Sequence, residues 1–398
     1  MPFSRIKLEG ENEVKQWGKQ IKIPAVYMRG GTSKGIFFLK EDLPSDPSER
    51  DKLLLRVMGS PDPYGQQIDG MGAATSSTSK VVIISKSNRL GCDVDYLFGQ
   101  VAIGQPLIDW SGNCGNLTAA VGPFAIDHGL VDAPKDGVAT VHIWQENIGK
   151  EIIAHVPMKD GEVQELGDFV LDGVAFPASE IKLEFLDPGG EGGVLPTGNP
   201  IDILHVPGIG EVEVTLINAG NPSVFISASS MGLTGTELQQ DINSNPDLLA
   251  RLEWIRAHGA VAMGVADDIE YAMAKRQHTP KIAFLAEPAS YTASSGKVVR
   301  REEIDLLARI LSMGKLHHAM TGTGAVAMAA AAAIPGTIVS NILGRTVSEI
   351  RIGHPSGIVR VGAAVERHHH RWMVKKVVMS RSARRLMEGF VLVPNIID

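Results

Sequence analysis

The sequence predicts an α/β protein made of two related domains that face each other. Each half contains a glycine-rich turn followed by a run of small apolar residues, which is typical of a buried helix. The turn is 111–116 in the first half and 322–324 in the second, with small apolar runs at 117–121 and 325–333. Short β-branched runs around both helices predict sheets. A loop rich in glycine and proline, 187–200, marks the expected domain boundary.

Strands dominate the expected first half. The glycine turn at 29–35 separates the first two strands. Pro123 lies inside the second helix and is expected to break or kink it, because proline lacks the N–H that an interior helical position uses. The expected strands are 21–27, 36–39, 80–84, 96–103, 138–144, 152–156, 169–170 and 181–185, and the expected helices are 48–58 and 116–127.

The second half repeats this pattern of strands and glycine-rich turns and contains more helix. Pro246 is expected to interrupt a long helical segment. A turn is expected at 218–222, between two strands. The expected strands are 211–217, 223–227 and 282–286, and the expected helices are 238–258, 304–313 and 325–333.

The amino-acid composition of the chain argues against several classes of function. The 398 residues carry 45 acidic and 38 basic side chains without long blocks of one sign, which argues against a nucleic-acid partner. Residues 1–20 form a polar leader without the apolar core of a secretory signal. The longest apolar run, 325–334, is too short to span a membrane. Two cysteines make no disulfide framework and fit a reducing compartment, so we expect a cytoplasmic protein.

The two cysteines have different sequence surroundings. Cys114 lies in the turn at 111–116, just before a helix, whose partial positive charge favours a thiolate. The N–H groups of the same helix end can hold a carboxylate. Cys92 lies beside Asp93 and Asp95, whose charges disfavour a thiolate, and we regard it as structural. Cys114 is the candidate reactive cysteine, while a small buried residue that fills space is an equally good interpretation.

Lys80 follows several hydroxyl-bearing residues and begins a β-branched run. Ser77 and Lys80 match the Ser-x-x-Lys spacing of penicillin-recognising enzymes, but the β-branched residues disfavour the helix that this motif requires. Two interpretations of Lys80 remain. It is either a solvated lysine at a strand edge, or a lysine at a pocket floor whose burial lowers its pKa and makes it a usable base.

Other polar segments offer weaker signals. The loop 29–35 lacks the residue order of a phosphate-binding loop, and either holds a carboxylate or forms a simple hairpin turn. His317 and His318 precede the second glycine turn, where they face either a pocket or the core. The three histidines at 368–370 alternate faces if they lie on a strand, so a solvated turn is favoured over a metal site. No metal or cofactor motif is convincing, and we expect neither.

Several of these segments together resemble the 2-methylaconitate cis–trans isomerase family, which has a diaminopimelate-epimerase-like fold. The matching stretches are 28–35, 59–65, 72–80, 109–116, 278–281 and 313–318. The resemblance implies an α/β (α+β) fold of two pseudo-symmetric domains, each a curled, mostly antiparallel sheet around a central helix. The implied domains are 21–190 and 191–379, and the segment from about 380 to 398 packs back on the first domain.

The resemblance also implies a cofactor-independent isomerase that moves an allylic proton of 2-methylaconitate, a small tricarboxylate of propionate breakdown through the 2-methylcitrate cycle. Lys80 and Cys114 are then the catalytic pair, and which of them is the base stays open. Epimerases of this fold use two cysteines, but Thr321 occupies the second position and its hydroxyl is no comparable base. The implied substrate-binding residues are Arg29, Thr32, Ser33, Ser79, Asn113, Gly115, Asn116, Lys281, His318, Met320, Thr321 and Gly322.

Two other functions remain open at this stage. A tautomerase of the same family that acts on 4-oxalomesaconate uses similar proton transfer. A non-catalytic accessory protein to an aconitase-like dehydratase is the second alternative. The resemblance is also compatible with a homodimer and with a functional link to such a dehydratase.

Overall fold

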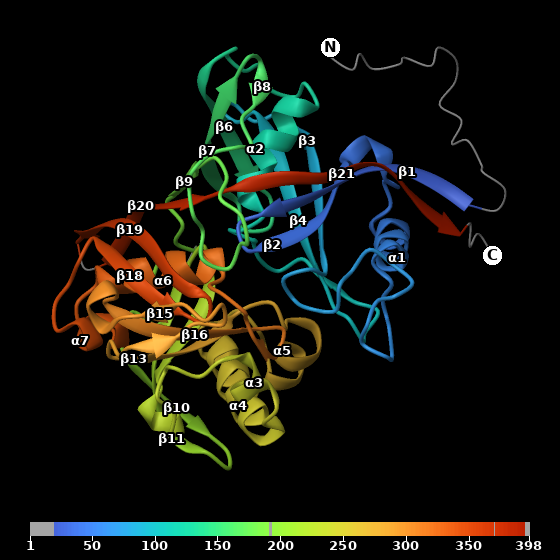
Figure 1. Ribbon diagram of the computed structural model, residues 1–398. Coiled ribbons are helices and arrows are strands. Elements are labelled where there is room, and N and C mark those ends of the chain that lie inside the picture. The colour runs from blue at the N-terminus through green and yellow to red at the C-terminus, as the bar shows by residue number, and fades with distance from the viewer. Residues whose placement is uncertain (1–19, 191–192, 370, 395–398) are drawn as a thin grey trace, which may run out of the picture.

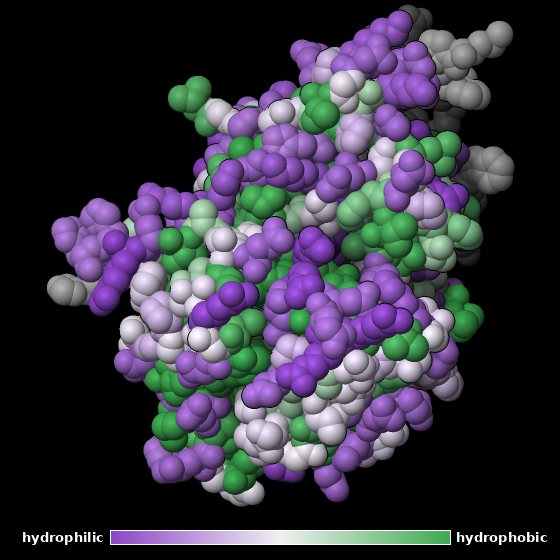
Figure 2. All heavy atoms as spheres, turned by 60° about the vertical axis from the view of Figure 1, so that its left-hand side comes forward, coloured by the Kyte–Doolittle hydropathy of each residue, from purple (hydrophilic) through white to green (hydrophobic). Residues whose placement is uncertain are grey.

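The computed structural model describes residues 20–190, 193–369 and 371–394, and Figure 1 shows two lobes joined by long strands. Nearly all of the expected leader at 1–20 lies outside the described residues, as do residues 191–192 at the expected boundary and His370. None of the helices formed by the described residues has both the length and the apolar character that a membrane span requires. The face shown in Figure 2 mixes hydrophilic and hydrophobic residues, and no single apolar area covers it.

Seven strands of the first lobe form a sheet that curls around helix α2 (Thr118–Asp127). The strands are β1 (Gln20–Gly30), β2 (Ser33–Leu39), β3 (Lys80–Lys86), β4 (Val94–Val101), β6 (Gly137–Gln145), β7 (Lys150–Lys159) and β9 (Ile181–Leu186). In this order, successive pairs run antiparallel, parallel, antiparallel, parallel, antiparallel and antiparallel. Helix α2 is buried from Thr118 to Ala125, as its small apolar residues predict.

Seven strands of the second lobe curl in the same way around helix α6 (Gly322–Ala332). The strands are β11 (Gly210–Ala219), β12 (Asn221–Ser227), β13 (Lys281–Ala286), β16 (Leu306–Ser312), β18 (Glu349–His354), β19 (Gly357–His368) and β20 (Arg371–Arg381). Their pairs follow the same order of antiparallel and parallel contacts. Each central helix lies between the fourth and fifth of these strands in the chain. The two lobes therefore repeat one topology, which is the fold class that the sequence predicts.

Shorter elements complete the two lobes. Helix α1 (Pro47–Met58) begins after the N-cap residue Asp46, and Pro47 is its first residue. The helix ends at Gly59, whose left-handed backbone conformation favours glycine. The other helices are α3 (Gln239–Asn243), α4 (Pro246–Ala262), α5 (Ile269–Lys275), α7 (Ile338–Leu343) and the 3₁₀ turns η1 (Lys40–Asp42), η2 (Ser229–Met231) and η3 (Arg301–Glu303). The short strands are β5 (Ile108–Asp109), β8 (Glu162–Val163), β10 (Asp202–Val206), β14 (Tyr291–Thr292), β15 (Val298–Val299) and β17 (Lys315–Leu316).

The end of the described chain returns to the first lobe. Strand β21 (Ala383–Pro394) pairs with β1 along its length, from Gln20 opposite Pro394 to Gly30 opposite Ala383. Strand β20 pairs with both β19 and β9 and so joins the two sheets (Figure 1). From these pairings we propose the domain division 21–190 and 191–379, with the last segment belonging to the first domain.

Two expected elements are wrong. The segment 304–313 is the strand β16 and not a helix. Strand β16 (Leu306–Ser312) is buried throughout and lies between β13 and β18. Because both of its faces are buried, its mostly apolar residues show no alternation that separates a strand from a helix. The expected strand at 169–170 is also wrong, because Phe169 makes only an isolated bridge with Ala178.

Two prolines have different effects. Helix α2 begins at Thr118 and continues through Pro123 without ending there. The surrounding sheet buries Pro123 and its neighbours, and this packing offsets the ~3 kcal/mol that an interior proline costs. The predicted interruption at Pro246 is confirmed, because α3 ends at Asn243 and Pro246 is the first residue of α4.

Candidate active site

The N-termini of the two central helices meet between the lobes. Gly115 lies in the turn before α2, and Gly322 is the first residue of α6. A β-carbon on Gly322 would lie 2.6 Å from the carbonyl carbon of Gly115, and one on Gly115 would lie 3.0 Å from that of Gly322. Only glycine permits this approach on both sides. The first-turn amides of a helix have no intrahelical partner, so each N-terminus carries a partial positive charge. The contact between the two glycines therefore brings two positive helix ends to one place.

Lys80 is buried beside this junction. It is the first residue of β3 and only 4% exposed. Its Nζ donates to Oε1 of Gln100 at 2.5 Å, lies 4.9 Å from the ring centre of Phe98 and is close enough to the side chain of Cys114 for the charges of the two groups to interact. Burial lowers the pKa of Lys80, while the nearby Cys114 raises it. The solvated strand-edge interpretation is therefore wrong.

Cys114 is buried at the start of the turn that leads into α2. Its Sγ accepts a hydrogen bond from the backbone N–H of Leu117 at 3.5 Å, so a helix-end amide points at the sulfur. Cys92 differs, because it is half-buried and its pKa is raised by burial and by acids that include Glu151 and Asp95. Cys114 is therefore the cysteine that lies beside both a lysine and a helix end.

Asn113 leaves one donor unused next to Cys114. Its backbone N–H donates to Oδ1 of Asn221 at 2.8 Å, and its carbonyl oxygen accepts from Nδ2 of Asn221 at 2.9 Å. The side-chain Nδ2 of Asn113 is buried without a hydrogen-bond partner in the described part of the chain. Since buried polar groups are rarely left unpaired, this donor fits a ligand oxygen.

Three of the expected substrate-binding residues make hydrogen bonds within the protein. Asn116 donates to Thr32 Oγ1 at 3.0 Å and accepts from Nε of Arg381 at 3.0 Å. Ser79 donates to the side chain of Gln67 at 2.7 Å. The guanidinium of Arg29 donates to the carbonyl oxygens of Gly31 and Ser382, which fixes the β1–β2 hairpin. The loop 29–35 forms a hairpin turn, and most of its residues also line the cavity described below.

The second lobe contributes buried residues from three segments. Met320 is 2% exposed, and Thr321 caps α6 by accepting the N–H of Gly324 at 3.2 Å. Lys281 begins β13 and is 3% exposed; its Nζ donates to Ser312 Oγ at 3.2 Å. Its pKa is lowered to about 7, mainly by burial and then by the charge of Lys80.

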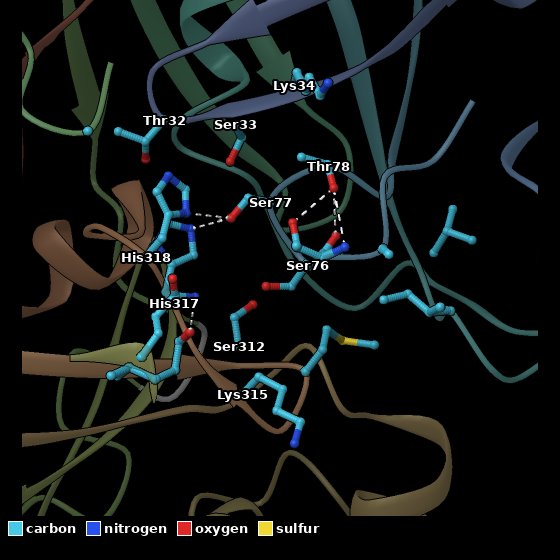
Figure 3. A pocket seen from close by; sticks show the side chains of 18 of the residues that line it. Thr32, Ser33, Lys34, Ser76, Ser77, Thr78, Ser312, Lys315, His317 and His318 are labelled. Atoms are coloured by element: carbon cyan, nitrogen blue, oxygen red, sulfur yellow. Dashed lines mark hydrogen bonds between the residues drawn. The ribbon is translucent and has the colours of Figure 1, made fainter. Parts of the chain in front are cut away.

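A cavity of about 820 Å³ opens above these buried groups. Thr32, Ser33 and His318 are among the predicted residues that line it, as Figure 3 shows. Lys80, Cys114 and Lys281 are buried and do not line it.

Ser77 lines the cavity and forms hydrogen bonds from the first lobe to the second. Its Oγ lies 3.1 Å from both Nε2 of His317 and Nδ1 of His318 (Figure 3). Nδ1 of His317 accepts the backbone N–H of Ala319, so Nε2 carries the proton and donates to Ser77, which in turn donates to His318. Burial lowers the pKa of both histidines, which favours these neutral forms.

The site holds more buried positive than negative groups. Lys80, Lys281 and Arg381 are buried, and within the described residues none of them forms an ion pair with a carboxylate. Burial lowers the pKa of Arg381 to about 10. Asp109 is a buried acid nearby, and its two oxygens accept backbone N–H groups of Ser111 and His278. The arrangement therefore suits an anionic ligand.

Sequence reasoning missed Gln100, Asn221 and Arg381. Their roles depend on strands that are distant in the chain, and no local pattern marks them. The exposed His368 and His369 lie at the end of β19, as expected for a solvated turn, and outside the site.

Comparisons with known proteins agree with this architecture. The family model described as "PrpF protein" matches residues 20–394. A 2-methyl-aconitate isomerase of Shewanella oneidensis is 62% identical over 388 residues, covering 94% of this chain and 98% of that protein. A crystal structure of methylitaconate-delta-isomerase has 41% identity and a TM-score of 0.74, covering 95% and 97% of the two chains.

A hydroxyproline epimerase from Agrobacterium vitis shares the fold alone, with 11% identity, a TM-score of 0.55 and coverage of 95% and 94%. The epimerase-like fold class predicted from the sequence is thereby confirmed. Since the family model covers nearly the whole chain, this protein belongs to the PrpF family.

Proposed function

We propose that this protein isomerises 2-methylaconitate between its cis and trans forms by removing and returning an allylic proton, without a cofactor. The observation that carries the proposal is the buried pair of Lys80 and Cys114 at the junction of two helix N-termini. The name of the relative with 62% identity supports the substrate. The excess of buried cations supports a substrate with several carboxylates.

The reaction needs a group that takes and returns one proton. In the proposed mechanism, the C–H bond of the allylic carbon breaks, and its proton passes to the Lys80–Cys114 pair. The electron pair delocalises over the former double bond into a carboxylate, so that bond can rotate. Return of the proton to the same carbon restores the double bond in the other geometry. Atoms and electrons balance without an oxidant or a reductant.

The environment of Lys80 suits this task. Burial lowers its pKa, which favours the neutral amine that can accept a proton. Once charged, the ammonium is stabilised by Gln100 Oε1 and by Cys114. If the proton rests on Lys80 at the start, the Cys114 thiolate takes the role of base, and the pair still exchanges one proton with the substrate.

The polar groups around the pair suit the carboxylates of the substrate. The amides at the two helix ends and the unpaired Nδ2 of Asn113 are donors that need no rearrangement. Thr32, Ser33 and His318 line the cavity above them. Asn116 and Ser79 keep a supporting role in this proposal, because the protein already occupies their polar atoms. Arg29 donates to the protein through its Nη1 and also lines the cavity, so it remains a candidate carboxylate ligand.

The direct test is to incubate the purified protein with cis-2-methylaconitate and follow the proton NMR spectrum. Appearance of the trans isomer, with no second protein present, supports the proposal. The same protein is incubated with 4-oxalomesaconate as a control for tautomerase activity. A much higher kcat/KM on 4-oxalomesaconate would overturn the substrate assignment, and no reaction with either acid would overturn the enzymatic proposal.

A further inference from the structure

The strand register places three cations side by side in the first lobe. Arg29 on β1 lies directly opposite Lys34 on β2 and, on its other side, directly opposite Arg384 on β21. Side chains directly opposite each other in antiparallel strands point to the same face of the sheet. The three side chains, which we call the cationic row, therefore lie next to one another across three adjacent strands.

The fold does not neutralise the cationic row with ion pairs. Among the residues that the structure describes, no carboxylate forms an ion pair with Arg29, Lys34 or Arg384. Burial lowers the pKa of Arg29 most, the charge of Arg384 lowers it further, and the opposite effect of Glu165 is smaller. Like charges directly opposite each other destabilise a sheet. The cationic row is thus a cost to the folded state, which favours a role other than stability.

The cationic row borders the cavity of about 820 Å³. Arg29 and Lys34 line it, and so does Leu386, two residues beyond Arg384 on β21. Lys315 on β17 lines it from the second lobe, on the side opposite Lys34 in Figure 3. None of the described residues that line this cavity is acidic. A cleft lined by charges of one sign concentrates ligands of the opposite sign.

The cavity leads toward the buried pair of Lys80 and Cys114. Ser77 lines the cavity and precedes Lys80 by three residues. Thr32 lines it too and accepts a hydrogen bond at 3.0 Å from Asn116, which follows Cys114 by two residues. The cavity wall is therefore continuous with the turns that carry the pair. A substrate that enters the site through this cavity is exposed to the field of the cationic row.

We propose that Lys34 and Arg384 recruit the substrate: their charges draw the tricarboxylate anion from solution into the cavity, without touching the reacting atoms. The inference rests on the proposed function and adds an entry step to it. Lys34 Nζ lies 5.3 Å from the ring centre of Tyr27, a contact that holds the ammonium beside the cavity. Because the attraction acts on the substrate and on the transition state alike, it lowers KM and leaves kcat unchanged.

The test removes two charges of the cationic row in the full chain. Lys34→Gln combined with Arg384→Gln, the row double variant, is expected to raise KM for 2-methylaconitate about tenfold at low ionic strength, with kcat within about twofold of the wild type. Arg29 stays in place, because it also fixes the hairpin. Lys52→Gln combined with Arg367→Gln is the matched control. It removes the same charge from exposed positions on α1 and β19 that do not line the cavity, and it should keep the wild-type KM.

Salt and stability separate recruitment from a structural role. The Debye length falls from about 30 Å at about 0.01 M salt to about 8 Å at about 0.15 M, so the KM ratio between the row double variant and the wild type should fall about threefold or more. Urea unfolding of this variant should give a free energy no lower than that of the wild type, because repulsion within the row is relieved. A structural role would instead lower the stability and leave a KM ratio that salt does not change.

A ligand that cannot react tests the inference apart from the reaction. Propane-1,2,3-tricarboxylate has no double bond to isomerise, and its Kd, measured by calorimetric titration at low salt, should rise about tenfold in the row double variant. Rises in KM and Kd that salt removes support the inference. An active wild type whose row double variant keeps both values within about twofold overturns the inference and leaves the proposed function intact, and so does a KM ratio that salt does not change. A wild type that binds the tricarboxylate through the row but isomerises neither 2-methylaconitate nor 4-oxalomesaconate overturns the proposed function alone.

Discussion

Gly115 and Gly322 lie backbone to backbone, so the two central helices point their N-termini at the same small volume. This contact joins the lobes at the place where Lys80 and Cys114 lie. Any side chain on either glycine must push the helices apart.

Gly322→Ala is expected to destabilise the protein by about 1–3 kcal/mol, because its methyl group would sit 2.6 Å from the carbonyl carbon of Gly115. It should also lower the isomerase activity by separating the helix ends. Urea unfolding measures the first effect. Gly189→Ala is the control, since a β-carbon there would meet nothing closer than 3.7 Å. Equal unfolding free energies for the two variants would contradict the packing argument.

Lys80→Met and Cys114→Ala are each expected to lower kcat about 10²–10⁴-fold, the range for loss of a general acid or base. NMR assays with 2-methylaconitate measure the loss. Cys92→Ala is the control and should keep wild-type kcat, because Cys92 lies outside the site. If either Lys80→Met or Cys114→Ala retained wild-type kcat, that residue would have no role in proton transfer.

Thr321 should matter for stability more than for chemistry. Thr321→Val removes the oxygen that caps α6 and is expected to cost about 1 kcal/mol of unfolding free energy. Because the hydroxyl is not a base, kcat should stay within about tenfold of the wild type. A tenfold change corresponds to about 1.4 kcal/mol in the activation free energy. Thr321→Ser keeps the cap and should restore stability. The opposite result is a Thr321→Val variant with wild-type unfolding free energy and a kcat that is lower by about 10²-fold or more. A loss of that size is typical of acid–base catalysis and would indicate a catalytic hydroxyl.

Ser77→Ala tests the polar bridge between the lobes. The variant leaves His317 and His318 without their shared partner, which should cost about 1–3 kcal/mol for buried groups left unsatisfied. Unfolding in urea measures this loss. Thr75→Ala in the same loop is the control, because its side chain is exposed and bonds only within the loop. Identical stability for the Ser77→Ala variant and the wild type would exclude the bridge as a stabilising contact.

Acid should destabilise the protein partly through His354. Burial lowers the pKa of this side chain to about 3, below the value of about 6.5 in an unfolded chain. Between these two values the unfolded state binds more protons, so stability falls as the pH decreases from about 6.5 toward 3. His354→Asn keeps an acceptor for the N–H of Ser356 and should reduce this slope in unfolding measurements. An unchanged slope would mean that other groups cause the acid sensitivity.

Local patterns predicted the central features of the site, and distant contacts escaped prediction. Both glycine turns and both buried helices follow from residues adjacent in the chain. Burial of Lys80 was one of two open interpretations, because its surroundings depend on β4, where Gln100 lies opposite. The pairing of Asn113 with Asn221 spans the two lobes and leaves no local signal.

One wrong prediction and one missed residue have the same physical origin. The segment 304–313 is mostly apolar and has no strict alternation, so only its pairing with β13 and β18 identifies it as a strand. Arg381 has no sequence pattern that marks it as buried, because its position depends on β20 ending beside Asn116. Topology, rather than local propensity, decides both cases.

Exchange of the allylic hydrogen with solvent tests the central claim most directly. The protein is incubated with 2-methylaconitate in D₂O, and deuterium at the allylic carbon is followed by NMR through many turnovers. We expect both isomers to gain deuterium there in step with isomerisation, and Lys80→Met to abolish both processes. Complete isomerisation without any deuterium at that carbon would contradict proton transfer through Lys80 and Cys114.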